Sequence, residues 1–399
     1  MTNKKDPSSW RLATKLVRGG LTRSQFGETS EAMYITSGFA YDAAETAAAR
    51  FAGEADGYTY SRLSNPTVAM FEDRMAILEG MPVAKATATG MAAVNAALMS
   101  QLKAGDRVVA SKALFGSCRY VVEEIIPRFG IEVELVMGGD NDAWAGAITP
   151  GTTTVFVETP ANPTLDVVDL KHVCDLAHKV GATVVVDNVF ATPLLQRPSD
   201  FGADVVVYSA TKHIDGQGRV LGGCILCSEA FFEDHLNQFL RHTGPTMSPF
   251  NAWVLVKGLE TLELRLTRMC ENAAKVADFL AGHGTLDRVL YPGRADHPQH
   301  ALAMQQMSAG GTVITVDVPG GRDNAFKLLN ALEIIDISNN LGDAKSLMTH
   351  PASTTHRAIA EAARLELGII EGTLRLSVGL EDADDLIEDL DQALNRIDR

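Results

Sequence analysis

Residues 202–213 read GADVVVYSATKH, an apolar run that gives way to a turn rich in hydroxyl groups. A continuous run of valines is typical of a strand that is buried on both faces of a parallel sheet. We therefore predict a strand over residues 202–210. The turn after it holds one amine, that of Lys212, between Ser209, Thr211 and His213.

The same pattern of buried strands recurs from about residue 83 to residue 228, with helical patterns in between. Strand-like runs rich in β-branched residues occur at 107–111, 131–136, 153–159 and 182–188. Helical patterns occur at 90–102, 118–129 and 169–180. This alternation predicts an α/β fold with a mostly parallel sheet that helices cover on both faces. Such sheets bind ligands outside the carboxyl ends of their strands.

A long helical stretch at 248–284 separates this region from a smaller C-terminal unit. The smaller unit has strands of its own at 310–320 and 372–380 and ends in an amphipathic helix over 382–397. The first 60 residues or so have weak periodicity, so we expect an extended arm there. We predict three parts: an arm (1–62), a large domain (63–256) and a C-terminal α/β domain (257–399).

Charge and composition favour a small-molecule partner. The 399-residue chain has 50 acidic and 35 basic residues, a formal charge of −15, and it contains no basic run. Such a surface repels nucleic acid and anionic membranes, so we expect neither as a partner. No secretory h-region or membrane-spanning apolar run occurs, and five scattered cysteines suit a reducing compartment. We therefore expect a cytoplasmic protein.

Two groups of cysteine and histidine residues resemble metal sites only superficially. Cys224 and Cys227 form a CxxC pair inside a predicted strand, where positions three apart point to opposite faces. His172, Cys174 and His178 do not converge on one face of a helix. We predict buried thiols in the first case, a mostly surface helix in the second, and no metal.

The predicted strand ends and helix starts together supply the groups that one cofactor needs. They are Asp187, Ser209, Thr211, Lys212 and the TATGM turn (87–91) that opens a helix at Gly90 and Met91. A helix N-terminus and hydroxyl groups bind phosphate, an amine forms an imine with an aldehyde, and a buried carboxylate keeps a heterocyclic nitrogen protonated. Pyridoxal 5'-phosphate requires all three. Neither a G-x-G-x-x-G after a strand nor a P-loop occurs to support a nucleotide instead.

Four stretches carry a resemblance to a known family. They are YTYSRLSNPT (58–67), VETPANPT (157–164), YSATKHIDGQGRVLGG (208–223) and RLSVGLED (375–382). Together, and in this order, they resemble the Cys/Met-metabolism family of pyridoxal phosphate-dependent enzymes over almost the whole chain. The resemblance implies the pyridoxal phosphate-dependent transferase fold, which is aspartate aminotransferase-like (fold type I).

The resemblance also assigns roles around the cofactor. Lys212 would hold pyridoxal phosphate as an imine, and Asp187 would pair with the pyridine nitrogen. Phosphate ligands would come from Gly90, Met91, Ser209 and Thr211, and from Tyr60 and Arg62 of a neighbouring subunit. The resemblance therefore implies a homotetramer built from dimers with shared active sites.

On the substrate side, the resemblance implies that Arg375 binds the α-carboxylate and that Asn162 contacts both the cofactor's phenolic oxygen and the substrate. Phe115 would stack on the cofactor ring, where lyase members of the family commonly have a tyrosine. Ser117 replaces a cysteine found in methionine γ-lyases. Both departures weaken a lyase assignment, and Phe115 leaves proton transfer to Lys212.

The implied activity is a replacement at the γ-carbon of an acylated homoserine. The first hypothesis is that sulfide replaces succinate on O-succinylhomoserine, giving homocysteine for methionine biosynthesis. An acetyl ester, cysteine as the sulfur donor, or γ-elimination from methionine stay open, as does a cofactor-binding regulator without turnover. Arg119 and Arg241 are candidates for binding the succinyl carboxylate.

Overall fold

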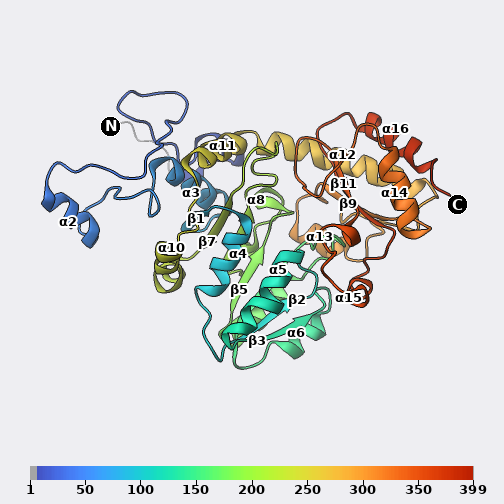
Figure 1. Cartoon of the computed structure of the whole chain (residues 1–399), viewed down its shortest axis with the longest axis horizontal. Coiled ribbons are helices and arrows are strands. Elements are labelled where there is room, and N and C mark those ends of the chain that lie inside the picture. Colours follow the sequence, from blue (N-terminus) through green and yellow to red (C-terminus); the bar gives the residue numbers. More distant parts are fainter. Residues whose placement is uncertain (1–6, 399) are drawn as a thin grey trace.

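A seven-stranded sheet forms the centre of the protein in the computed structural model, which describes residues 7–398 (Figure 1). Its strand order is β1-β7-β6-β5-β4-β2-β3, and only β7 runs antiparallel to its neighbours. The predicted mostly parallel sheet is therefore confirmed. Its strands are β1 (Val83–Thr87), β2 (Arg107–Ser111), β3 (Glu132–Val136), β4 (Thr152–Glu158), β5 (Thr183–Asp187), β6 (Val205–Ser209) and β7 (Gly223–Cys227).

Both faces of this sheet are buried, which explains the unbroken apolar runs. In β5, Val184 and Val186 belong to the apolar cluster on one face, and Val185 to the cluster on the other. Cys224 and Cys227 likewise lie in different clusters, as the strand period predicts. All five cysteines are buried and unpaired.

Helices cover the two faces of the large sheet. Helices α4 and α5 contribute to one cluster, and α3, α7 and α11 contribute to the other. The helices up to this point are α1 (Leu12–Arg18), α2 (Ala44–Ala52), α3 (Pro66–Glu79), α4 (Gly90–Met99), α5 (Gly116–Tyr120), α6 (Asn141–Ala147), α7 (Leu170–Lys179), α8 (Thr192–Leu195), α9 (Glu229–Phe231), α10 (Asn237–Thr243) and α11 (Pro249–Glu260). Helices on both faces of the sheet are the arrangement that the sequence predicts.

A second, five-stranded sheet forms the C-terminal part, in the order β10-β11-β12-β9-β8. Its strands are β8 (Arg288–Leu290), β9 (Val313–Asp317), β10 (Asp336–Ile337), β11 (Leu347–Thr349) and β12 (Thr373–Ser377). The remaining helices are α12 (Leu262–Gly282), α13 (His300–Gln306), α14 (Gly321–Ala331), α15 (Glu361–Glu366) and α16 (Ala383–Leu394). Helices α12, α14 and α16 share an apolar cluster with this sheet, which gives it a core of its own.

Helix α12 bridges the two sheets. Leu262 at its start belongs to a cluster of the large sheet, and Val276 and Leu280 near its end belong to the cluster of the small sheet. The predicted helical stretch over 248–284 is interrupted at Thr261, where φ is −112° and ψ is 6°. There the Thr261 N–H bonds to the Gly258 carbonyl, which closes α11 before α12 begins.

The N-terminal segment carries two short helices, α1 and α2, and α2 projects away from the rest of the chain in Figure 1. Near the end of this segment, a single β-bridge joins Gly38 to Tyr60. Between residues 7 and 398, no helix combines the length and the apolar character needed to cross a membrane.

Candidate active site

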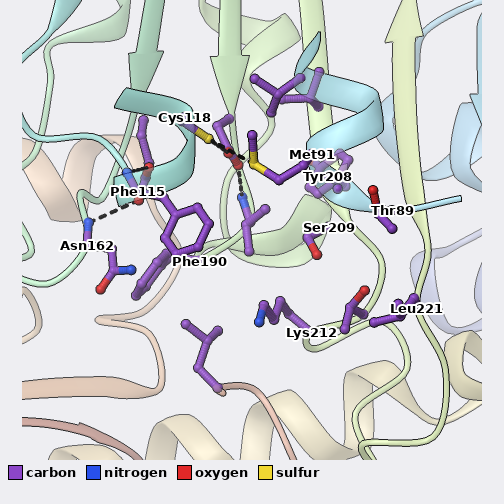
Figure 2. Close-up of a pocket in the computed structure, with 18 of the residues that line it drawn as sticks. Thr89, Met91, Phe115, Cys118, Asn162, Phe190, Tyr208, Ser209, Lys212 and Leu221 are labelled. Carbon is purple, nitrogen blue, oxygen red and sulfur yellow. Dashed lines mark hydrogen bonds between the residues drawn. The ribbon is translucent and has the colours of Figure 1, made fainter. Parts of the chain in front are cut away.

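A cavity of about 860 Å³, including the part open to solvent, lies at the carboxyl ends of the large sheet's strands. Nine of the eleven residues predicted for the site line it: Gly90, Met91, Phe115, Asn162, Asp187, Ser209, Thr211, Lys212 and Arg375. Figure 2 shows Phe115, Asn162, Ser209 and Lys212 around this one opening.

Lys212 lies in the turn after β6, and its Nζ donates a hydrogen bond to Asn340 Oδ1 (2.5 Å). Burial, together with the nearby charge of Arg375, lowers the pKa of Lys212 to about 8. A sizeable share of this amine is therefore neutral near physiological pH, whereas an ordinary lysine would be almost entirely protonated. A neutral amine can act as a nucleophile or as a base.

Asp187 ends β5 and is buried, with 6% of its surface exposed. Its Oδ1 accepts the Val189 N–H at 3.1 Å, and burial raises its pKa to about 7. No cationic side chain of residues 7–398 forms an ion pair with it. A protonated ring nitrogen would supply the missing positive partner.

The start of α4 and the end of β6 form a cradle for an anion. A Cβ added to Gly90 would lie 2.6 Å from the Ser209 Cβ, so only glycine allows the strand end to approach the helix so closely. Thr89 caps the helix by accepting the Ala92 N–H at 3.0 Å, and the first N–H groups of α4 point out of the helix. These groups and the Ser209 hydroxyl suit a phosphate. The Thr211 hydroxyl is held by the backbone of Gly222.

Arg375 on β12 reaches the cavity from the small sheet and is only 1% exposed. Its Nη1 donates to Asn162 Oδ1 (3.0 Å), and its Nη2 donates to the carbonyls of Asn339 and Asn340 (2.9 and 3.0 Å). Its Nε has no partner among the described residues. A buried guanidinium with an unused donor suits a carboxylate ligand. The arginine is thus a buried group rather than an exposed strand charge.

Tyr60 and Arg62 do not line this cavity. The Arg62 guanidinium lies 5.5 Å from the ring centroid of Tyr60, and its Nη1 donates to the Arg241 carbonyl. Tyr60 is 44% exposed. Within one chain, these two residues are therefore separate from the other nine.

Some residues that line the cavity were not predicted from the sequence. Glu158 ends β4 as Asp187 ends β5, and its position at a strand end inside VETPANPT was the signal that could have revealed it. Asn339, which follows β10, could not be found in this way, because only the folding of the small sheet brings it near Lys212. The structure also places Thr89, Val189, Phe190, Leu221 and Leu341 at the cavity.

The described residues contain no cluster of three or more potential metal ligands. Cys174 is a buried thiol whose pKa burial raises to about 12, so it is a poor ligand. The donor set of the cavity instead fits pyridoxal phosphate. It combines a buried carboxyl without a cation, an amine of lowered pKa, a helix N-terminus next to a hydroxyl group, and an arginine with a free Nε donor.

Comparisons with known proteins agree with this fit. Residues 13–395 match the family described as Cys/Met metabolism PLP-dependent enzyme. The chain is 54% identical over 398 residues to an O-succinylhomoserine sulfhydrylase of Mycobacterium tuberculosis, and the match covers 99% of this chain and 98% of that one. It is 40% identical over 388 residues to an L-methionine gamma-lyase of Porphyromonas gingivalis, with 97% of each chain covered.

A solved structure extends the comparison to the cofactor. A protein of Campylobacter jejuni, solved with N'-pyridoxyl-lysine-5'-monophosphate, aligns with a TM-score of 0.92 at 32% identity, and the match covers 97% of this chain and 100% of that one. In that protein, a pyridoxyl group is thus joined to a lysine within the same fold. The chain described here belongs to the Cys/Met-metabolism family of pyridoxal phosphate-dependent enzymes.

Proposed function

We propose that this enzyme is an O-succinylhomoserine sulfhydrylase, which replaces the succinate of O-succinylhomoserine with sulfide and yields homocysteine for methionine biosynthesis. The observation that carries the proposal is the 54% identity over 99% of the chain to a protein of this name, against 40% to an L-methionine gamma-lyase. Phe115 and Ser117 support it, since both depart from the residues expected of a lyase.

In this proposal, bound pyridoxal phosphate acts as an electron sink that makes the α- and β-hydrogens of the amino acid acidic. The side chains of this protein orient the substrate and move the protons. Arg375, steadied by Asn162 Oδ1 at 3.0 Å, binds the α-carboxylate. The Lys212 amine, displaced by the substrate, removes the α-proton and then helps to remove a β-proton. Charge at the β-carbon expels succinate from the γ-carbon, hydrosulfide adds there, and Lys212 returns the protons to the β- and α-carbons to give homocysteine.

Phe115 cannot take part in proton transfer, because its ring carries no hydroxyl group. Lys212, whose pKa of about 8 lies near physiological pH, performs both transfers in this proposal, since Asp187 is assigned to the ring nitrogen. Asp187 keeps the ring nitrogen protonated, and the start of α4 with Ser209 holds the phosphate. The proposed roles therefore belong to different residues that lie around the same cavity.

Specificity constants decide between the open alternatives. The purified enzyme is incubated with O-succinylhomoserine or O-acetylhomoserine, each with sulfide or cysteine, and with methionine alone. We expect the highest kcat/KM for O-succinylhomoserine with sulfide. A higher value for the acetyl ester, for cysteine or for methionine cleavage would replace the proposal by the corresponding activity. Full cofactor absorbance without any turnover would instead indicate a regulator.

The residue that meets the succinyl carboxylate is a separate question. Arg119 donates to Glu123 through Nε (2.8 Å) and Nη2 (2.9 Å), and only 11% of its side chain is exposed. The Arg241 carbonyl accepts a bond from Arg62. Both arginines stay candidates, and kcat/KM for the succinyl ester relative to the acetyl ester in each alanine variant distinguishes them.

We also propose a homotetramer built from dimers in which Tyr60 and Arg62 complete the phosphate site of a neighbouring subunit. The separation of these two residues from their own chain's cavity supports this proposal, as does the projecting arm (Figure 1). The arm also carries exposed apolar side chains that a neighbour would cover, such as Phe26 (84% exposed), Ile35 (72%) and Phe51 (61%). In this proposal, residues 1–62 form the arm, 63–256 the large domain and 257–399 the C-terminal domain.

Complementation between inactive variants tests the shared site. Arg62→Ala should weaken cofactor binding by about 1.5–3 kcal/mol, the scale of one hydrogen-bonding partner to a charged group. When Arg62→Ala protein is mixed with Lys212→Ala protein under conditions that exchange subunits, activity should return. One site of each mixed dimer then takes its lysine from one chain and its arginine from the other, so that this site is complete.

If each site were built within a single subunit, every site would keep one lesion and mixing would restore nothing. A mixture of Lys212→Ala protein with Asp187→Ala protein is the matched control. Both of these residues line the same chain's cavity, so each site of that mixed dimer keeps one lesion and no activity should return. Subunit exchange is verified independently in both mixtures with differently labelled chains.

We further propose that the enzyme works in the cytoplasm. Its five cysteines are all buried and unpaired, which supports this proposal. Free thiols are the ordinary state of cysteine in a reducing compartment, whereas disulfides form and persist in oxidising ones. Fractionation of the source cells, with the enzyme followed by its activity, tests the location.

A further inference from the structure

Glu158 is a buried acid at the cavity to which the proposed mechanism gives no role. It is the last residue of β4 and the register partner of Asp187, so two carboxyl groups end neighbouring strands side by side. Only 2% of its surface is exposed. Both of its oxygens are occupied: Oε2 accepts the Phe115 N–H at 2.6 Å and Oε1 accepts the Asn162 N–H at 3.0 Å.

The two donors belong to different parts of the site. Phe115 immediately precedes α5, a short helix without a side-chain cap of its own, and lies 43 positions from Glu158. Asn162 lies four positions after Glu158 and binds Arg375 Nη1 through its carboxamide oxygen. The Glu158 carboxyl group thus fixes the backbone of Phe115, which is predicted to stack on the cofactor ring, relative to the backbone of Asn162. The side chain of Asn162 in turn steadies Arg375, the predicted ligand of the substrate carboxylate.

Burying the Glu158 carboxyl group beside Asp187 makes its ionised form unfavourable. Burial and the adjacent Asp187 raise the pKa of Glu158 well above its usual value, while the two N–H bonds and the charge of Arg375 oppose the rise. A carboxylate has acceptors on both oxygens, whereas a carboxyl group with a proton on one oxygen would have to turn that proton away from an N–H donor. The two N–H bonds and Arg375 stabilise the ionised form, but burial and Asp187 outweigh them, so that the pKa of Glu158 stays raised.

We propose that Glu158 is a positioning residue, which holds Phe115 against the cofactor ring and Asn162 beside the substrate α-carboxylate as one rigid unit. This inference rests on the proposed placement of cofactor and substrate in the cavity. Glu158 acts through backbone N–H groups and does not itself react.

Glu158→Gln tests the proposal in the holoenzyme. Glutamine has nearly the same shape but only one acceptor oxygen, so its NH₂ group would face one of the two N–H donors. We expect KM for O-succinylhomoserine to rise and kcat/KM to fall, by about 10- to 100-fold in kcat/KM, the scale of leaving one buried N–H donor without an acceptor. We also expect the visible circular dichroism of the bound cofactor to change, because its ring is no longer held in one orientation against Phe115.

Asp389→Asn is the matched control. Asp389 is also buried and accepts three backbone N–H bonds, from Glu333 (2.8 Å), Ile334 (3.0 Å) and Ile335 (3.0 Å), but it lies on α16 in the C-terminal part. Its substitution should lower the thermal stability while KM and the visible circular dichroism stay as in the wild type. A purely structural role for Glu158 would give the same result for both variants, and that outcome would overturn the inference.

A third variant covers the case in which Glu158→Gln fails to fold. Glu158→Asp keeps the carboxyl group and both oxygens but is one methylene shorter, so it should fold and show a smaller change of the same kind. Wild-type KM and circular dichroism in this variant would contradict the proposal. If wild-type protein acquired no visible chromophore with pyridoxal phosphate, the proposed function itself would fail, which distinguishes the two failures.

Discussion

Replacing Lys212 with alanine is expected to lower turnover by at least about a thousandfold, because the variant loses the amine that, in the proposed mechanism, both tethers the cofactor and moves the protons. The lowered pKa of Lys212, about 8, makes this amine available in its neutral form, and no other lysine lines the cavity among the described residues. The absorbance of the bound cofactor should shift to that of the free aldehyde. Steady-state kinetics and visible spectra measure both effects.

A control and a rescue make this result specific. Lys171→Ala, on the exposed face of α7 where Lys171 pairs with Asp175, should leave turnover and spectrum unchanged. An added small primary amine that fits the space left by the side chain should restore part of the activity of Lys212→Ala. Turnover close to that of the wild type in Lys212→Ala would remove this lysine from the mechanism.

Asp187→Asn is expected to reduce kcat by about 100-fold or more while cofactor remains bound through its phosphate. Asparagine can still accept the Val189 N–H, but it lacks the charge that keeps a ring nitrogen protonated, so the ring becomes a poorer electron sink. A hydrogen bond to a charged group contributes about 1.5–3 kcal/mol, a factor of roughly 10 to 150 in rate, before the electronic effect is added. Rapid-mixing kinetics with measured cofactor occupancy test this expectation.

The positive charge on the ring nitrogen can also be supplied without Asp187. A cofactor analogue methylated at the ring nitrogen is permanently positive and needs no carboxylate to protonate it. Loading Asp187→Asn with this analogue should recover part of the lost rate, whereas loading the wild type should give no gain. An Asp187→Asn enzyme with an unchanged rate would show that Asp187 does not contact the ring nitrogen.

The sequence was informative wherever local pattern and tertiary environment agree. A strand that is buried on both faces must be apolar throughout, so the valine runs before Asp187 and Ser209 revealed β5 and β6. The carboxyl ends of parallel strands meet at one edge, so Asp187 and Lys212 could be placed in one site from the order of strands and turns alone. Glu158 was missed although the same rule applies to it, because its role depends on N–H groups that a sequence does not display.

Features that depend on a second subunit or on the packing of distant segments could not be predicted from local sequence pattern. Tyr60 and Arg62 were assigned by resemblance alone, and their separation from the cavity within one chain is a property of the folded arm. The break at Thr261 was not predicted, because residues on both sides of it have helical patterns and only the packing of α11 and α12 on different sheets separates them.

The amino-acid sequence by itself therefore determined strands β2 to β6, helices α4, α5 and α7, the α/β class and the cofactor chemistry at the strand ends, since periodicity and residue type are local properties. Only the tertiary structure decided that Arg375 and Asn340, from the smaller sheet and its loops, meet Asn162 and Lys212. It also decided the lowered pKa of Lys212 and the raised pKa of Asp187, because desolvation depends on every group that packs around a side chain, and most of those groups are distant in sequence.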